Sequence, residues 1–150
     1  MTRPRSTGRA AVVLALVAAA CLGCWYLYDP PWVGQETSGF SRWQDDGAGR
    51  RFRWTLGRAT FYVPREATSL TLPMRAAFPG PLGAAVRVSI AVDDRQLAEM
   101  TLEKPEAWVT PQLPLPARMT RRHFRRVDLH VSRTVGDEMR GIQVGEIGTW

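Results

Sequence analysis

Cysteine is scarce in this chain of 150 residues, since only Cys21 and Cys24 occur and both lie in one apolar stretch near the start. Their C-x-x-C spacing is found in redox motifs and zinc sites. Here no βαβ pattern surrounds it, no histidine follows for haem attachment, and no second pair completes a zinc site. We therefore interpret both cysteines as packing residues. The remainder of the chain must be stabilised by a hydrophobic core, for which about 110 residues suffice.

Histidine is equally rare, and His123 and His130 are the only two. The chain also lacks the GxSxG and HExxH motifs and any glycine loop that could cradle phosphate. We therefore expect a protein that is not an enzyme and that has no cofactor and no metal site. A glycoside hydrolase, the enzymatic alternative, would need two carboxylates from different strands to face each other across a cleft.

Lysine is nearly absent, and the formal net charge of +6 comes almost entirely from arginine. Three of the 20 basic residues precede the apolar stretch, which leaves 17 basic against 14 acidic residues, a net of +3, from Asp29 onward. A nucleic-acid-binding domain would concentrate more positive charge than this, so we expect no nucleic-acid partner.

Residues 10–28 contain neither charge nor proline. As a helix they would span about 28 Å, close to the hydrocarbon thickness of a bilayer. Arginines precede the stretch and Asp29 follows it, which places the N-terminus in the cytoplasm. Aromatic residues gather at the far end, where amphipathic rings favour the membrane interface (Trp25, Tyr26, Tyr28, Trp32). The pattern predicts an uncleaved transmembrane signal anchor.

Two other interpretations of the stretch stay open. The alanines before Cys21 could form a signal-peptidase site, and Cys21 itself could be lipidated. All three place residues 33–150 outside the cytoplasm. We predict a cytoplasmic segment 1–9, a transmembrane helix 10–28 and a linker or irregular lead-in 29–50. The expected location is a bacterial inner membrane, crossed once, with the C-terminal domain in the periplasm.

Residues 51–150 alternate between apolar and polar side chains over short runs, which is typical of strands with one buried face. Phe52, Trp54 and Leu56 are predicted to share a buried face opposite Arg51, Arg53 and Thr55. Three further runs follow the same rule (Leu70, Leu72 and Met74; Val86, Val88, Ile90 and Val92; Val127, Leu129 and Val131). A tight turn is expected at Asp93–Asp94–Arg95. The pattern predicts an all-β, antiparallel, jelly-roll-like β-sandwich.

The order of these segments carries a resemblance. A strand with "RWT" is followed by a strand pair around "VDDR", by "LPLP", by "VDLHV" and by a final "RGIQVGEI", with Trp54, Trp108 and Arg140 as landmarks. This order resembles the galactose-binding-like and carbohydrate-binding-module jelly rolls that occur beside bacterial envelope glycosyltransferases. The resemblance implies a non-catalytic module that binds glycan, without fixing any ligand residue.

Among the aromatic residues, Trp43 is the best ligand-binding candidate, because Trp54 and Trp108 fall in patterns that favour packing. Trp43 lies in a polar, glycine-rich segment. Sugar rings stack on exposed aromatic faces, and their hydroxyls need polar groups nearby. Asp45 and Asp46 could accept hydrogen bonds from hydroxyls, and Arg42 could donate them.

The run "RRHFRR" is a second candidate, as a contact for an anionic headgroup or an acidic glycan (Arg121, Arg122, Arg125, Arg126). It equally suits a solvated loop that enters a strand.

Two functions therefore compete. The first is a membrane-anchored envelope protein whose sandwich binds or positions a glycan, as an accessory to a membrane glycosyltransferase. The second is a structural or assembly subunit that binds another envelope protein. Exposed aromatic rings with polar neighbours favour the first, and a flat apolar patch favours the second.

Overall fold

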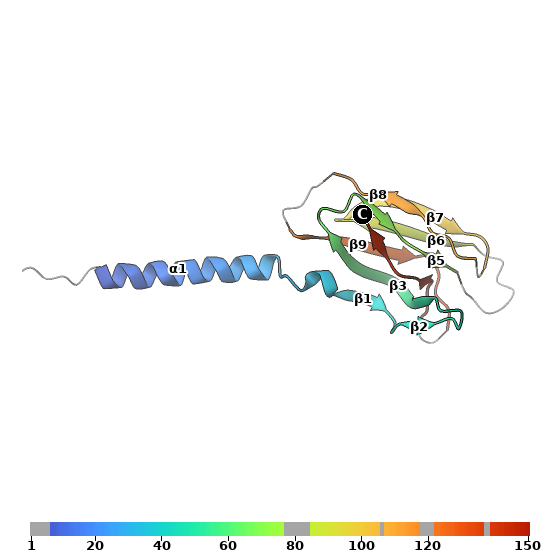
Figure 1. Cartoon of the computed structure of the whole chain (residues 1–150), viewed down its shortest axis with the longest axis horizontal. Coiled ribbons are helices and arrows are strands. Elements are labelled where there is room, and N and C mark those ends of the chain that lie inside the picture. Colours follow the sequence, from blue (N-terminus) through green and yellow to red (C-terminus); the bar gives the residue numbers. More distant parts are fainter. Residues whose placement is uncertain (1–6, 77–84, 106, 118–121, 137–138) are drawn as a thin grey trace, which may run out of the picture.

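The computed structural model describes residues 7–76, 85–105, 107–117, 122–136 and 139–150. One long helix, α1 (Thr7–Tyr28), extends away from a β-sandwich, as the sequence predicted (Figure 1). Pro30 and Pro31 follow its end, because proline cannot continue a helix. The helix is long and apolar enough to cross a membrane, and none of that window is buried in the protein. Both a membrane anchor and a signal sequence have this length and composition.

A short 3-10 helix, η1 (Val33–Gln35), connects α1 to the sandwich. The described strands follow it in chain order: β1 (Thr37–Phe40), β2 (Gln44–Asp45), β3 (Arg51–Pro64), β4 (Ser69–Thr71), β5 (Met74–Arg75), β6 (Val86–Val92), β7 (Arg95–Leu102), β8 (Gln112–Pro114), β9 (Phe124–Val131), β10 (Gln143–Val144) and β11 (Gly148–Thr149).

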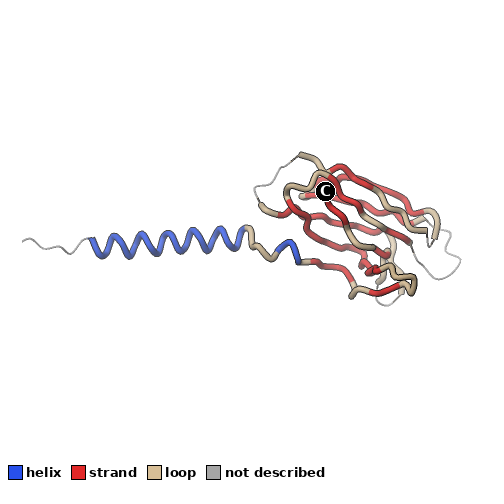
Figure 2. Tube along the Cα trace, viewed as in Figure 1, coloured by secondary structure: helices blue, strands red, loops and turns tan. Residues whose placement is uncertain are grey.

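The strands form two sheets, and each pairing between the strands described is antiparallel. The larger sheet has the order β5-β10-β3-β9-β6-β7, with β1 and β2 also paired to β3. The smaller sheet has the order β11-β4-β8. Figure 2 shows the strands running the length of the sandwich and the helix standing clear of them. The predicted fold class is confirmed.

One hydrophobic core joins the two sheets. The alternation predicted for β4 and β5, for β6 and for β9 is confirmed, because the residues assigned to their inner faces are buried. Leu70, Leu72 and Met74 of the β4–β5 segment belong to the same cluster as Val88 of β6 and Leu129 of β9. Burial of such side chains contributes roughly 1.5–3 kcal/mol each.

The face predicted for the first half of β3 is wrong for Trp54 and Leu56, whereas Phe52 is 6% exposed and therefore buried as predicted. Thr55 is 0% exposed, whereas Leu56 is 41% exposed, and Trp54 lies outside the core. The buried face of β3 is the odd-numbered one, since Ala59 and Phe61 lie opposite the inward-facing residues of β9. The same face continues back to Arg53, which is buried at the end of the core.

A two-residue turn joins β6 to β7, and Val92 pairs directly with Arg95. Asp93 and Asp94 both have positive φ, 50° and 65°. A type I′ turn requires this at both central positions, and aspartate tolerates it better than most residues. The turn is therefore one residue shorter than predicted, because Arg95 already belongs to β7.

Candidate functional site

Two open pockets adjoin at the end of the sandwich where β3 begins. Their volumes are about 500 Å³ and 480 Å³, and both are lined by Arg51 and Glu146. We call them together the arginine groove, defined by Trp43, Arg50, Arg51, Arg53, Thr110 and Glu146. Its side chains come from five segments: the loop before β2, the turn between β2 and β3, the start of β3, the loop before β8 and the loop before β11.

Arg53 is the buried charge of the groove and is only 9% exposed. Its guanidinium carbon lies 3.8 Å from the ring centre of Phe40 and 4.9 Å from that of Trp43. Nη1 donates a hydrogen bond to Thr37 Oγ1 at 3.3 Å. The Nε atom is buried and has no hydrogen-bond partner among the described residues. Burial lowers the pKa of Arg53 below its ordinary value.

Trp43 lies at the rim of the groove and is 40% exposed. The guanidinium carbons of Arg51 and Arg53 lie 5.3 Å and 4.9 Å from its ring centre, within the range of cation–π interactions. Arg51 also lies 4.0 Å from Glu146, which lines both pockets. The structure thus brings the sequence candidate Trp43 together with two arginines that the sequence did not single out.

The other candidates near Trp43 have structural partners in their own turn. Asp45 Oδ1 accepts a hydrogen bond from the Gly47 amide, and Asp46 Oδ1 accepts from the Ala48 and Arg50 amides. The Arg50 and Ala48 amide hydrogen bonds, in that order, lower the pKa of Asp46. Both aspartates brace the turn that presents Arg50 and Arg51. Arg42 is exposed, and neither it nor the aspartates line the groove.

Guanidinium groups also lie over a second set of aromatic rings, those of Phe52, Trp54 and Trp108. The ring centre of Trp108 lies 5.1 Å from the guanidinium carbon of Arg50 and 5.0 Å from that of Arg75. Phe52 and Trp54 meet edge to face, and Arg140 lies over Trp54. Stacked guanidinium groups therefore cover aromatic residues that the sequence analysis assigned to packing patterns.

The "RRHFRR" arginines do not form one patch. Arg121 lies outside the described residues, and Arg122 lies over the Tyr28 ring at the end of α1. Arg125 is 1% exposed; it donates to Asp93 at 3.0 Å and to the Pro116 carbonyl at 2.9 Å. Strand alternation places the next residue, Arg126, on the opposite face of β9.

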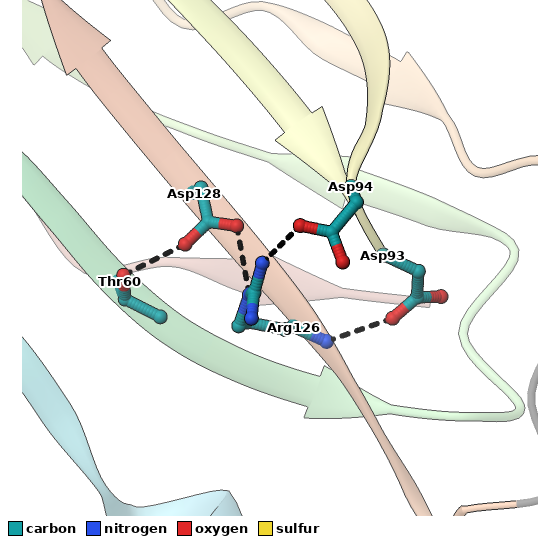
Figure 3. Close-up of polar contacts among 5 residues, drawn as sticks. All are labelled: Thr60, Asp93, Asp94, Arg126 and Asp128. Atoms are coloured by element: carbon teal, nitrogen blue, oxygen red, sulfur yellow. Dashed lines mark hydrogen bonds and ion pairs between the residues drawn. The ribbon is translucent and has the colours of Figure 1, made fainter.

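Arg126 joins the outer face of β9 to the β6–β7 turn. Figure 3 shows its side chain between Asp94 and Asp128, while its backbone amide donates to Asp93. The hydrogen bond to Asp128 is the main cause that raises the pKa of Arg126. Asp128 also accepts a hydrogen bond from Thr60 of β3 at 2.8 Å (Figure 3). Arg125 and Arg126 thus serve mainly to fix the hairpin turn.

A third cavity, of about 700 Å³, lies where α1 meets the sandwich, and apolar side chains of both line it. Asp29 closes this junction, because its buried carboxylate accepts hydrogen bonds from the backbone amide of His123, at 2.8 Å, and from its ring Nδ1. Gly34 lies against the Phe124 ring so closely that any Cβ atom there would clash. These contacts set the position of α1 relative to β9.

The described part of the chain contains no group of three or more histidine, cysteine or carboxylate side chains placed to hold a metal ion. His130 lies exposed on β9, opposite Arg58 of β3.

No family model matches the chain. A search of curated proteins also finds no match. Solved structures with a similar fold include the C-terminal domain of EclA, a sugar-binding protein, at 17% identity and a TM-score of 0.43 over 61% of this chain and 64% of that one. A family 2 carbohydrate esterase from Clostridium thermocellum has 10% identity and a TM-score of 0.49 over 77% of this chain and 31% of its own.

A family 35 carbohydrate-binding module from an environmental isolate has 17% identity and a TM-score of 0.44 over 75% of this chain and 86% of its own. Modules of families 4, 6 and 36 are also among the similar structures. Several of these similar structures are carbohydrate-binding modules. The chain spans less than two thirds of the EclA domain and of the esterase. These similarities concern the fold, and the ligand named for each neighbour belongs to that neighbour.

Proposed function

We propose that this chain is a membrane-anchored, non-catalytic envelope protein whose sandwich binds or positions a glycan in the arginine groove, as an accessory to a membrane glycosyltransferase. The observation that carries the proposal is the groove itself. It is an open site in which the guanidinium groups of Arg51 and Arg53 lie near an exposed indole ring, and Arg50 lines the adjoining pocket.

The chemistry of the groove suits a saccharide. Sugar rings present apolar C–H faces to aromatic side chains and hydroxyl groups to planar hydrogen-bond donors and acceptors. Trp43 supplies the aromatic surface, the arginines supply donors, and Glu146 and Thr110 supply acceptors. The pockets adjoin along the Arg51–Glu146 pair, an arrangement that fits a ligand of more than one sugar unit.

A binding role is favoured over hydrolysis by the carboxylates. Glycosidases in general hold two carboxyl groups about 5–9.5 Å apart across the scissile bond. Among the described residues that line the groove, Glu146 is the only carboxylate, and it faces Arg51.

The anchoring part of the proposal rests on α1, whose apolar window is exposed throughout. An anchor predicts that full-length protein stays in the membrane fraction after carbonate washing. Recovery of a soluble product that begins near Cys21 would instead establish a cleaved signal.

The binding part is tested by titrating the full-length chain, in a sugar-free detergent, with fragments of envelope polysaccharide. We expect Trp43→Ala to weaken binding about tenfold, because the ring contact is lost. Trp32→Ala is the matched control, since Trp32 is 42% exposed but lies outside the groove. If no fragment binds at millimolar concentration and an envelope protein co-purifies in fixed ratio, the assembly-subunit alternative replaces this proposal.

A further inference from the structure

Arg53 is a buried cation that the described protein leaves incompletely paired. It takes part in none of the ion pairs between described residues, and its Nε atom has no acceptor there. Arg125, which is buried at least as deeply, has a carboxylate on Nε and a carbonyl on Nη1. The two residues show that this fold can supply acceptors to a buried guanidinium, whereas among the described residues Thr37 Oγ1 is the one acceptor that Arg53 has.

Leaving a buried charge without an anionic partner is costly. The rings of Phe40 and Trp43 offset part of that cost through cation–π attraction. They lie against the guanidinium without accepting hydrogen bonds in its plane, so the Nε edge still needs an oxygen acceptor. Arg53 lines the groove, and therefore that acceptor can come from a ligand.

We propose that the arginine groove recognises a carboxylate-bearing saccharide, such as a uronic-acid glycan, and that Arg53 binds the carboxylate. The inference deepens the proposed function and rests on it, because it names the class of glycan. The Nε edge of the guanidinium donates to the carboxylate oxygens, and Trp43 contacts the sugar ring at the rim.

Geometry favours a carboxylate. A guanidinium flanked by aromatic rings is approached in its own plane, and a planar carboxylate can take two parallel hydrogen bonds there. The net positive charge of the groove also favours an anionic ligand, since three arginines and one glutamate line it. The Nε atom is buried in this structure, so binding requires side chains of the pocket to rotate. Trp43 and Arg51 line the same pocket, are exposed and can change rotamer on a fast timescale.

The test compares two oligomers of equal length, oligogalacturonate and its full methyl ester, against the full-length chain in sugar-free detergent. The ester removes the negative charge and keeps the sugar rings. We expect the acid to bind about tenfold or more tightly than the ester. Arg53→Lys keeps the charge but loses the planar fork, so it should weaken this preference.

Arg58→Lys is the matched control, because Arg58 is an exposed arginine of the same strand and lies outside the groove. It should leave the preference unchanged. If Arg53→Lys does not fold, the comparison of acid and ester on the unmodified chain still decides the matter.

The outcomes separate the two proposals. Equal binding of acid and ester, weakened in both by Trp43→Ala, overturns the acid preference and leaves glycan binding intact. Binding of neither oligomer, nor of any other saccharide, overturns both. An acid preference that is undiminished in Arg53→Lys also overturns the inference. A sulfated galactan oligomer is the third arm, and tighter binding of it than of the uronate would assign the groove to sulfate esters.

Discussion

Two buried arginines at different places in one sandwich show how differently the same residue can be used. Arg125 lies in the inner face of β9, and its donors are taken by the Asp93 carboxylate and the Pro116 carbonyl. Arg53 lies in the inner face of β3, against two aromatic rings, with one hydrogen bond to Thr37. Neither residue has more than a tenth of its surface exposed.

The comparison distinguishes an arginine that stabilises the fold, Arg125, from one that we propose binds a ligand, Arg53. Arg125 and Arg126 are both paired with carboxylates, and their pairs with Asp93 and Asp94 fix the β6–β7 turn against β9. Around Arg53 the surroundings are aromatic and open to a groove. A cluster in which each charge has a partner stabilises the fold. A buried charge that lacks an acceptor is stabilised when a ligand supplies one, and this makes ligand binding more favourable.

The largest difference in unfolding free energy is expected when each arginine is replaced by methionine, which has an unbranched side chain and no charge. Arg125→Met leaves the Asp93 carboxylate without its cation and should lower the free energy of unfolding by about 3 kcal/mol. Arg53→Met removes a charge that lacks an anionic partner among the described residues and should change it by less than about 1 kcal/mol. Denaturant unfolding of both variants measures this. Equal losses would contradict the comparison.

A smaller difference in unfolding free energy is expected between variants of two threonines, one that contacts Asp128 and one that contacts Arg53. Thr60→Val removes the hydrogen bond to Asp128 and should cost about 1 kcal/mol of unfolding free energy. Thr37→Val removes a longer contact to Arg53 and should cost less than about 0.5 kcal/mol. Thermal melts of the pair check the order, and a larger loss for Thr37→Val would show that Arg53 depends on this hydroxyl.

The smallest effect concerns the turn that carries Arg50 and Arg51. Amide hydrogen bonds lower the pKa of Asp46 below its ordinary value of 3.8. A lowered folded-state pKa means that the stabilisation is present above the unfolded-state pKa and is lost as pH falls through the folded-state pKa. The stabilisation should therefore be complete at neutral pH and disappear only in strong acid.

NMR titration of the Asp46 carboxyl carbon measures this pKa. The Ala48 and Arg50 amide shifts should follow the same curve, and Asp46→Asn should remove that dependence from both. Titration of Asp46 at or above 3.8 would mean that the turn is not braced in this way.

Much of the fold could be predicted from alternation, because β6 keeps one apolar face throughout its length and β9 keeps one from Val127 to Val131. The first half of β3 could not be predicted in the same way. Phe52 and Trp54 look like core residues beside arginines, but the register with β9 fixes Ala59 and Phe61 inward. The same phase, continued back along β3, brings Thr55 and Arg53 to the buried side.

The candidate site was partly predictable. Trp43 stood out because it lies in a polar segment, and it does line the groove. Its neighbours Arg51 and Arg53 are brought there by the pairing of β2 with β3, which local sequence does not reveal. Extending the inward phase of β3 back from Val63 would have identified Arg53. The same alternation within "FRRVDLHV" would have separated Arg125 from Arg126.

The most direct test of the central claim is to follow the arginine Nε–Hε signals of the full-length chain during titration with oligogalacturonate. The account predicts that the Arg53 signal shifts to saturation with the acid, stays unmoved with the methyl ester, and is missing in Arg53→Lys. The Arg125 signal should not move, because Asp93 already occupies its Nε. An Arg53 signal that stays fixed while the acid binds would contradict the claim that this arginine is the ligand contact.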